Sequence, residues 1–201
     1  MKAEGVSPHE KFEAIYWVRF EDNSRRLATR NLSPGRAVYG EELVKFSGKE
    51  YRVWDAFRSK LAAAILKGIK DVPVVPRSTV LYLGAASGTT ASHVSDIIGK
   101  EGAVYCVEFA QRTMRELIEN VCSNRPNMFP ILADARHPSS YRSLVSSVGT
   151  IYCDIAQPEQ ARILADNADL FLKSSGSTMI AIKSRSVDVT LSPSSVFSRE
   201  E

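Results

Sequence analysis

Hydrophobic positions in the first fifty residues come in short runs that turn-forming residues separate. The runs are rich in aromatic and β-branched residues, and Asn, Ser, Pro and Gly cluster between them, as is typical of short strands joined by tight turns. The expected strands are residues 12–20, 26–29, 43–46 and 50–53. Residues 1–10 are polar, and we expect a disordered leader there. Residues 1–52 are therefore predicted to form a small N-terminal antiparallel β-rich domain.

From residue 53 onward, apolar runs of strand length alternate with segments of helical spacing. The expected strands are 79–83, 103–107, 128–132, 150–153 and 178–182, and the expected helices are 54–70, 87–98, 110–122, 141–148 and 158–173. The strand runs leave no polar face, which is typical of strands covered on both sides. This alternation implies right-handed crossovers and a doubly wound, mostly parallel α/β sheet. Residues 53–201 are predicted to form this larger domain.

The helix predicted over residues 54–70 carries one apolar stripe that would pack on the sheet. The stripe consists of Trp54, Phe57, Leu61, Ala64, Ile65 and Ile69. Lys60 lies beside this stripe and not opposite it.

A turn of small residues, Gly84-Ala85-Ala86-Ser87-Gly88, follows the strand predicted at 79–83, so a ligand can approach its backbone closely. Glu108 ends the next strand, 24 residues after Gly84, where an acid in a βαβ unit typically accepts hydrogen bonds from ribose hydroxyls. The turn reads G-x-x-x-G and lacks the G-x-G-x-x-G pattern of pyrophosphate sites. It therefore favours a nucleoside ligand without phosphates, such as S-adenosylmethionine, over NAD. A tight turn without a ligand is the alternative.

Five successive strands end in a residue that could contact a ligand. These residues are Gly84, Glu108, Asp134, Asp154 and Lys183. In an open parallel sheet the carboxyl ends of the strands border the ligand crevice, so we expect the five residues in one cleft. Each polar residue has a plainer alternative: Asp134 capping a turn, Asp154 capping the next helix, and Lys183 reaching solvent.

Composition narrows the class of protein. The chain has 201 residues, 44% of them hydrophobic, which suits one α/β domain with a small appendage. It has no apolar run of membrane-spanning length and its N-terminus is polar, so we expect neither a membrane span nor a signal peptide. The cysteines, Cys106, Cys122 and Cys153, form no C-x-x-C pair. A zinc site is therefore not expected, and a reduced cytosolic protein is the simplest interpretation.

The net charge of +3 is unevenly distributed. Residues 1–75 hold 14 Lys and Arg against 10 Asp and Glu, whereas residues 76–201 hold 12 against 13. Residues 23–39 contain Arg25, Arg26, Arg30 and Arg36 and no acid. A basic N-terminal part indicates a polyanionic partner, with a solvated loop as the alternative.

Eight stretches spread over roughly residues 12–199 carry a family pattern. They are LATRNLSPGRAVYGEE, YRVWDAFRSKLAAAILKG, VLYLGAASGTTASHVSDIIG, VYCVEFAQRTMREL, FPILADARHPSSY, IYCDIAQPEQA, NADLFLKSSGSTMIAIKSRSVDVT and SPSSVF. In these stretches the chain resembles the fibrillarin family in its archaeal form. The resemblance implies a Rossmann-like methyltransferase that uses S-adenosylmethionine for 2′-O-methylation of ribose in rRNA and tRNA.

The resemblance also implies site residues. The family's methionine-facing positions fall on Gly84, Ala85, Ser87, Thr89 and Thr90. Its ribose- and adenine-facing positions fall on Glu108, Phe109, Asp134 and Ala135, and Asp154 and Gln157 would line the methyl end. Lys60, Asp154 and Lys183 match a Lys-Asp-Lys catalytic arrangement. Our hypothesis is that Lys183 accepts the proton, Asp154 orients it, and Lys60 positions the ribose.

The chain departs from the family pattern in two places. The family usually has a proline between the Trp54 region and the next helix, where this chain reads Trp54-Asp55-Ala56-Phe57. The family also continues past residue 201 with a helix, a closing antiparallel β-pair and a fourth catalytic residue, a histidine. We therefore expect the closing strands to be missing from this sequence, and neither His9, His93 nor His137 matches that histidine.

Partners and location follow from the resemblance alone. Fibrillarin-like proteins act in box C/D particles with a guide RNA, a Nop-type scaffold protein and a kink-turn-binding ribosomal-type protein. The implied location is cytoplasmic in an archaeal cell and nucleolar in a eukaryotic one. Three alternatives stay open: a non-catalytic assembly subunit of the same particle, a histone-glutamine methyltransferase and a small-molecule methyltransferase.

Overall fold

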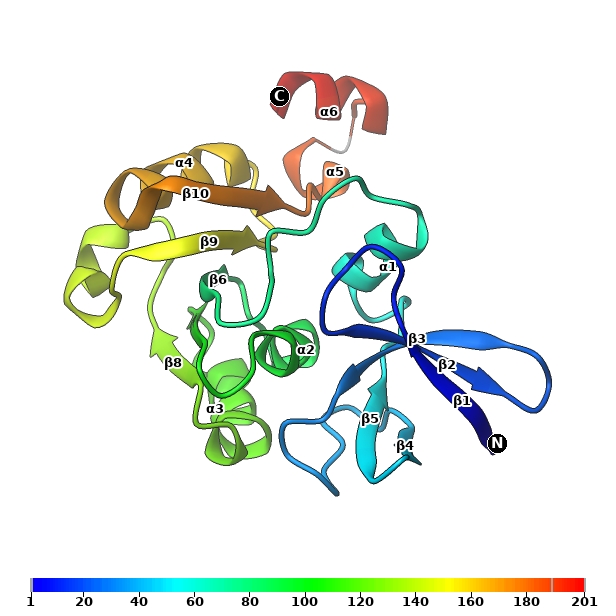
Figure 1. Ribbon diagram of the computed structural model, residues 1–201. Helices are drawn as coiled ribbons and strands as arrows, with labels where there is room; N and C mark the ends of the chain where they lie inside the picture. The colour runs from blue at the N-terminus through cyan, green and yellow to red at the C-terminus, as the bar shows by residue number, and fades with distance from the viewer. Residues whose placement is uncertain (1, 189, 201) are drawn as a thin grey trace.

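The computed structural model describes residues 2–188 and 190–200 and contains two five-stranded sheets, one after the other along the chain (Figure 1). The first sheet has the order β1-β2-β3-β5-β4, and its neighbouring strands are antiparallel. Its strands are β1 (Ala3–Pro8), β2 (Ile15–Phe20), β3 (Arg25–Arg30), β4 (Leu43–Phe46) and β5 (Lys49–Val53). The predicted antiparallel N-terminal sheet is confirmed.

The disordered leader is a wrong prediction, because β1 occupies most of it. β1 pairs with β2, with Val6 opposite Val18, and an irregularity between Ala3 and Gly5 shifts the register. Backbone hydrogen bonds to the edge of β2 stabilise this strand, and they do not require an apolar side-chain pattern. Polar composition alone was therefore a poor guide to its structure.

The second sheet is parallel throughout and has the order β10-β9-β6-β7-β8. Its strands are β6 (Thr79–Leu83), β7 (Ala103–Glu108), β8 (Met128–Leu132), β9 (Val148–Cys153) and β10 (Leu172–Ile180). β6 lies at the centre, and the order reverses on either side of it. The sheet is doubly wound, as predicted, and its strand ends meet at the edge where a ligand crevice forms.

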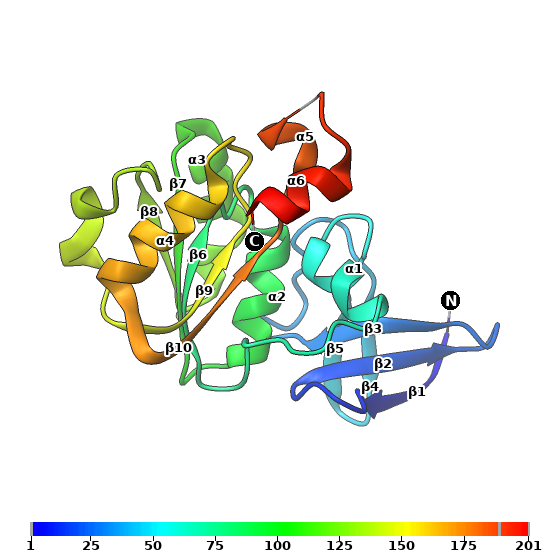
Figure 2. The same cartoon turned by 90° about the horizontal axis from the view of Figure 1, so that it is seen from above.

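Helices cover both faces of this sheet (Figure 2). α2 (Thr89–Ile98) and α3 (Gln111–Asn120) pack on the face that carries Val80 and Val104, and the first sheet lies beyond α2. α4 (Gln160–Phe171) and the 3-10 turn η2 (Pro138–Leu144) pack on the opposite face. The remaining elements are η1 (Cys122–Asn124), α5 (Ser184–Val187) and α6 (Pro193–Glu200). In the described part of the chain, no strand follows β10, and no helix is long and apolar enough to cross a membrane.

The helix predicted over residues 54–70 is much shorter, since α1 spans Lys60–Leu66. Ser59 caps its N-terminus, and the Asp55 carboxylate accepts a hydrogen bond from the Phe57 amide, which forms a turn before the helix. Phe57 is fully exposed and does not belong to the packed stripe. The start of α1 is therefore set by hydrogen bonds from backbone amides to the Asp55 and Ser59 side chains, and not by the apolar periodicity.

Two predicted boundaries in the second domain are also wrong. The helix expected over residues 141–148 is the 3-10 turn η2, which begins at Pro138. The strand expected over residues 178–182 begins earlier, since β10 spans Leu172–Ile180 and its register with β9 shifts between Leu172 and Ser177. Irregular pairing of this kind interrupts the regular pattern of a strand.

A buried polar network joins the first sheet to α2. The guanidinium of Arg52 contacts Asp96 at 2.9 Å and Glu41 at 2.5 Å, and Arg125 contacts the other oxygen of Asp96 at 2.5 Å. His93 lies among these groups, with Nδ1 2.7 Å from the Thr29 hydroxyl. All six side chains have almost no exposure, so the network fixes the two sheets relative to each other.

Candidate active site

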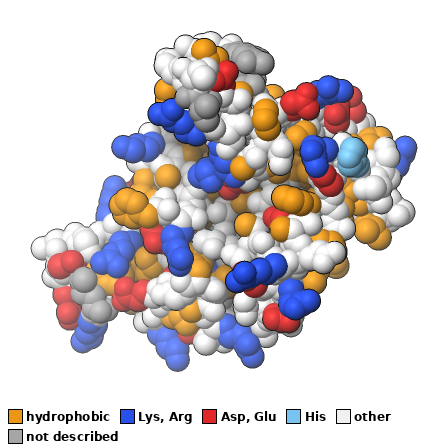
Figure 3. Space-filling model, turned by 180° about the vertical axis from the view of Figure 1, so that it is seen from behind, with side chains coloured by type: hydrophobic (Ala, Val, Ile, Leu, Met, Phe, Trp, Pro, Cys, Tyr) orange, Lys and Arg blue, Asp and Glu red, His pale blue; other side chains and the backbone are white. Residues whose placement is uncertain are grey.

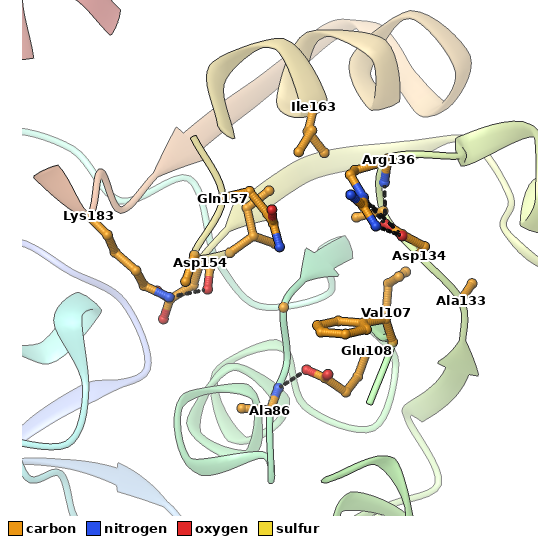
Figure 4. A pocket seen from close by; sticks show the side chains of 15 residues that line it. Ala86, Val107, Glu108, Ala133, Asp134, Arg136, Asp154, Gln157, Ile163 and Lys183 are labelled. Carbon is orange, nitrogen blue, oxygen red and sulfur yellow. Dashed lines mark hydrogen bonds and ion pairs between the residues drawn. The ribbon is translucent and has the colours of Figure 1, made fainter. Parts of the chain in front are cut away.

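The carboxyl ends of the parallel strands border a cavity of about 300 Å³ (Figure 4). Eight residues predicted from the sequence line it: Gly84, Glu108, Phe109, Asp134, Ala135, Asp154, Gln157 and Lys183. All five strand-end residues are among them, so the predicted convergence on one cleft is observed. The other lining residues are Ala86, Val107, Ala133, Arg136, Ile155, Ala156 and Ile163.

Glycine is required at position 84 because two constraints coincide there. Gly84 has φ +80°, in the region that favours glycine, and a Cβ atom there would lie 2.8 Å from the Asp154 carbonyl oxygen. The turn from β6 to α2 thus packs directly against the end of β9. This close approach brings the glycine turn and Asp154 to the same wall of the cavity.

The Glu108 carboxylate braces this turn from the end of β7. Its Oε2 accepts a hydrogen bond from the Ala86 amide at 3.1 Å, and its Oε1 accepts one from the Ala110 amide at 2.9 Å (Figure 4). Each carboxylate oxygen has a second lone pair, so the group can also accept hydrogen bonds from a diol. Phe109, the next residue, adds an exposed aromatic ring to the cavity wall.

Asp134 is paired with Arg136, a lining residue that the sequence analysis missed. The Arg136 guanidinium lies 2.6–3.1 Å from the two Asp134 oxygens, in a bidentate arrangement. The side-chain hydrogen bond from Arg136 lowers the pKa of Asp134, so the carboxylate is charged at neutral pH. An Asp and an Arg two residues apart in a loop after a strand are too common in sequences to indicate an ion pair such as this one.

One carboxylate oxygen connects two lysines at the other end of the cavity. Asp154 Oδ1 lies 3.0 Å from Lys60 Nζ and 3.0 Å from Lys183 Nζ. Lys183 Nζ also donates a hydrogen bond to the Asp154 carbonyl oxygen at 2.7 Å. The exposed fractions are 51% for Lys60, 12% for Asp154 and 24% for Lys183. Asp154 and Lys183 line the cavity, whereas Lys60 does not.

Four residues of the implied cofactor set do not line this cavity: Ala85, Ser87, Thr89 and Thr90. They belong to the glycine turn and the first turn of α2, on the other side of Gly84. Thr90 is buried, and its hydroxyl donates to Ser59 Oγ at 3.1 Å. Their assignment to the methionine end stays a prediction.

Two further residues that hold the lysines had no signal in the sequence pattern. Ser59 precedes Lys60 and caps α1, and Gln160 at the start of α4 accepts a hydrogen bond from the Lys183 amide at 3.3 Å. Both are fully buried. Only two contacts of the folded chain distinguish them, that of Ser59 with Thr90 on α2 and that of Gln160 with the Lys183 amide.

The histidines lie away from the two lysines. His93 is enclosed by Thr29, Tyr39 and Trp54, and burial lowers its pKa well below the ordinary value of 6.5. Across residues 2–188 and 190–200, no group of three or more His, Cys, Asp or Glu side chains is placed to hold a metal ion.

Comparison with known protein families gives one match over almost the whole chain. The profile of the fibrillarin family matches residues 6–201. A relative from Methanopyrus kandleri, named fibrillarin-like rRNA/tRNA 2′-O-methyltransferase, is 58% identical over 98% of this chain and 84% of its own length. A relative of the same name from Staphylothermus marinus is 54% identical over 97% of this chain and 83% of its own length.

Solved structures agree with the sequence relatives. Aeropyrum pernix fibrillarin with natively bound S-adenosyl-L-methionine has a TM-score of 0.92 and 54% identity, covering 99% of this chain and 86% of that one. The Methanococcus jannaschii fibrillarin pre-rRNA processing protein has a TM-score of 0.91 and 48% identity, covering 98% and 85%. A chain of a fibrillarin/Nop5p complex has a TM-score of 0.81 and 42% identity, covering 95% and 85%.

Proposed function

This chain belongs to the fibrillarin family, and from that membership we propose that it is an S-adenosylmethionine-dependent RNA 2′-O-ribose methyltransferase. The observation that carries the proposal is the shared oxygen of Asp154 between Lys60 and Lys183, at the end of a cavity bordered by the glycine turn. A cleft of this kind at the strand ends of a parallel sheet suits a nucleoside at one end and a reacting hydroxyl at the other.

The residues of the cavity fit the cofactor. Gly84 leaves the turn open to a ligand, Glu108 offers carboxylate lone pairs to the ribose diol, and the exposed ring of Phe109 offers a flat apolar surface to the adenine. We propose that Asp134 and Ala135 border the adenine edge and that Asp154 and Gln157 border the methyl end. Gly84, Ala85, Ser87, Thr89 and Thr90 are the proposed contacts of the methionine part.

When bound, the cofactor supplies a methyl group that its sulfonium already activates, so the protein has to align the ribose O2′ and remove its proton. We assign the proton acceptor to Lys183 Nζ, since this residue lines the cavity and its amine lies beside Asp154. Asp154 orients the amine by the contacts at 2.7 and 3.0 Å. Lys60, on the opposite side of Asp154 Oδ1, is the proposed contact of the ribose.

We further propose that a box C/D guide RNA directs the modification of rRNA and tRNA. A Nop-type scaffold protein, as in the fibrillarin/Nop5p complex, and a kink-turn-binding ribosomal-type protein would complete the particle, which we place in the cytoplasm. The surface charge supports a role in which the guide RNA, and not this chain, selects the target. Lys and Arg side chains are spread over the face in Figure 3 with acidic ones between them, and Arg26 and Arg25 of the basic segment are paired with Glu42 and Glu10. We therefore expect weak, nonspecific RNA binding by the isolated chain.

Reconstitution tests the proposal. The chain is combined with a Nop-type protein, a kink-turn-binding protein and a box C/D guide, and methyl transfer from labelled cofactor to a matching target RNA is measured. We expect transfer to one ribose that depends on the guide and is lost with a mismatched target. Cofactor and particle binding without any transfer would favour the non-catalytic assembly subunit. Nanomolar binding of bare target RNA would contradict the proposed role of the guide.

A further inference from the structure

Lys60 differs from Asp154 and Lys183 because it comes from the short helix α1, outside the second sheet. α1 has only seven residues, and a helix of that length does not hold its position by itself. Leu61, Ala62 and Ile65 are buried, but the Lys60 side chain is half exposed. Packing alone therefore does not fix the direction of the Lys60 side chain. The contacts that hold the first turn of α1 in place determine where the Lys60 amine lies.

Ser59 holds that turn through two contacts of one hydroxyl. Its Oγ accepts a hydrogen bond from the Ala62 amide at 3.3 Å, which caps α1, and a second one from the Thr90 hydroxyl at 3.1 Å. Ser59 is 2% exposed and Thr90 is 6% exposed. Because water cannot readily replace the lost partner at a buried site, removal of either hydroxyl takes one buried hydrogen bond from the other.

Thr90 is fixed in turn from the second sheet. It is the second residue of α2, whose N-terminus is capped by Gly88. Burial raises the pKa of Tyr82 on β6 well above its ordinary value, and the nearby Thr90 hydroxyl opposes that rise. Thr90 thus lies near Tyr82 of β6 and donates a hydrogen bond to Ser59.

We propose that Ser59, through Thr90, is a positioning residue that sets Lys60 relative to the glycine turn. The inference rests on the proposed function of the site. Thr90 ties the first turn of α1 to the first turn of α2, which follows the glycine turn. Lys60 directly follows Ser59, so this bond determines whether its Nζ reaches Asp154 Oδ1 at 3.0 Å. The same contact makes the placement of Lys60 sensitive to the conformation of the cofactor turn.

The first experiment measures methyl transfer by the reconstituted particle at saturating cofactor and target. Ser59→Ala and Thr90→Val each lower kcat by about 3- to 30-fold, the order expected when a reacting group is displaced. In a Lys60→Ala background neither change lowers kcat further, because the side chain that they position is gone. Thr90→Val is the cleaner change, since it keeps the shape of the side chain and the cap from Ser59 to Ala62.

The matched control is Thr150→Val. It also removes a buried threonine hydroxyl, which donates to the Pro73 carbonyl at 2.7 Å, but it lies near the start of β9 and away from the strand ends. We expect it to leave kcat unchanged in either background. Equal losses from Ser59→Ala and Thr90→Val with and without Lys60, or a change in cofactor KM alone, would overturn the proposal.

A second readout needs no methyl transfer. The free protein is acetylated with an amine-reactive ester, and mass spectrometry compares the rate at Lys60 with that at Lys67, an exposed lysine at the end of the same helix. Both variants should raise the Lys60 rate severalfold relative to Lys67, because the amine leaves Asp154, whereas Thr150→Val should not. An unchanged ratio in both variants rules the link out. An inactive wild-type particle would instead count against the proposed function, so the two failures are distinguishable.

Discussion

The Asp154 carboxylate contacts two lysine amines with one oxygen atom, and each Nζ lies 3.0 Å away. Without its charge, the Asp154 side chain would hold both amines less strongly in the geometry that the proposed proton transfer needs. The charge of Asp154 therefore matters more than its shape, and an amide of the same size tests this directly.

Asp154→Asn should reduce methyl transfer by about 100-fold or more, within the range that a positioned acid–base group contributes. The measurement is single-turnover transfer in the reconstituted particle, with cofactor affinity determined separately by calorimetry. Asp166→Asn is the control, since Asp166 lies on the exposed side of α4 and forms only a surface ion pair with Arg162. Transfer by Asp154→Asn at close to the wild-type rate would remove Asp154 from the assigned role.

Gly84→Ala separates a backbone constraint from a steric one. Gly84 and Gly35 have φ +80° and +82°, but an added Cβ meets the Asp154 carbonyl at 2.8 Å in the first case and nothing within 4 Å in the second. Both changes carry the cost of a left-handed backbone, about 1 kcal/mol.

Gly84→Ala should cost clearly more unfolding free energy than Gly35→Ala and should weaken cofactor binding, whereas Gly35→Ala should leave binding intact. Urea unfolding and calorimetric titration measure the two effects. Equal destabilisation by the two changes would mean that the approach of Gly84 to Asp154 has no energetic consequence.

At the scale of whole elements, buried strands were predictable and element ends were not. The strand at Thr79–Leu83 has the predicted bounds, because a strand covered on both faces needs an uninterrupted apolar run. The strand at Met128–Leu132 also has the predicted bounds, although it lies at the edge of the sheet and its Phe129 and Leu132 are exposed. α1 begins six residues later than predicted, at Lys60 instead of residue 54. Asp55 forms a turn before the helix and Ser59 caps it, and the sequence pattern does not reveal which of the two residues takes the cap position. β1 was missed because an edge strand is stabilised mainly through its backbone.

Deletion of residues 2–8 tests whether β1 belongs to the folded sheet. We expect a lower thermal midpoint, because β2 loses its hydrogen-bonded neighbour and Val6 leaves the apolar cluster around Val18 and Phe20. In chains of 150–250 residues each kcal/mol lost lowers the midpoint by about 2–4 °C. A triple change of Lys2, Glu4 and Ser7 to Ala, which keeps the backbone pairing, is the control. An unchanged midpoint after deletion would restore the prediction of a dispensable leader.

At the scale of the whole molecule, the two sheets are joined by buried charges. Asp96 on α2 takes one arginine from each side: Arg52 of the first sheet and Arg125 of the segment before β8. The sequence pattern showed two sheets but not this junction, since single charged residues within apolar segments do not indicate their partners. The domain division at residues 52/53 stays a prediction, and the network implies that neither part is as stable alone.

His93 makes this junction sensitive to acid. In the folded protein it is buried beside the cations Arg52 and Arg125, and burial lowers its pKa well below 6.5, so it stays neutral there. Above about pH 6.5 the unfolded form is neutral too, and the full stability is present; below it, the unfolded chain takes up a proton that the folded chain resists. Stability should therefore fall with pH, by up to about 1.4 kcal/mol for each pH unit below 6.5 from this group.

Urea unfolding between pH 7.5 and 5.5 measures this slope. His93→Gln should flatten it, whereas His137→Gln, a change at an exposed histidine, should keep the wild-type slope. If the wild-type protein is equally stable at both pH values, the buried histidine does not govern the junction.

The prediction of the candidate site succeeded where topology alone determines proximity. Gly84, Glu108 and Asp154 meet because carboxyl ends of parallel strands share an edge, which the order of elements implies. Arg136, Ser59 and Gln160 were missed because each acts through a contact with a side chain or backbone group that only the folded chain brings near. Phe57 shows the converse, an apolar residue whose spacing fits a buried stripe but whose ring is fully exposed.

The strand order has a consequence for the chain as it leaves the ribosome. The first sheet is complete once Val53 has emerged, before any strand of the second sheet exists. Arg52 then waits 44 residues for Asp96 to be synthesised, and β6 obtains its β9 neighbour only after β7 and β8 have formed. During that interval Arg52 has Glu41 but not Asp96 as a partner, and β6 has no neighbouring strand, so pausing in translation between residues 53 and 96 should be where a chaperone is needed most.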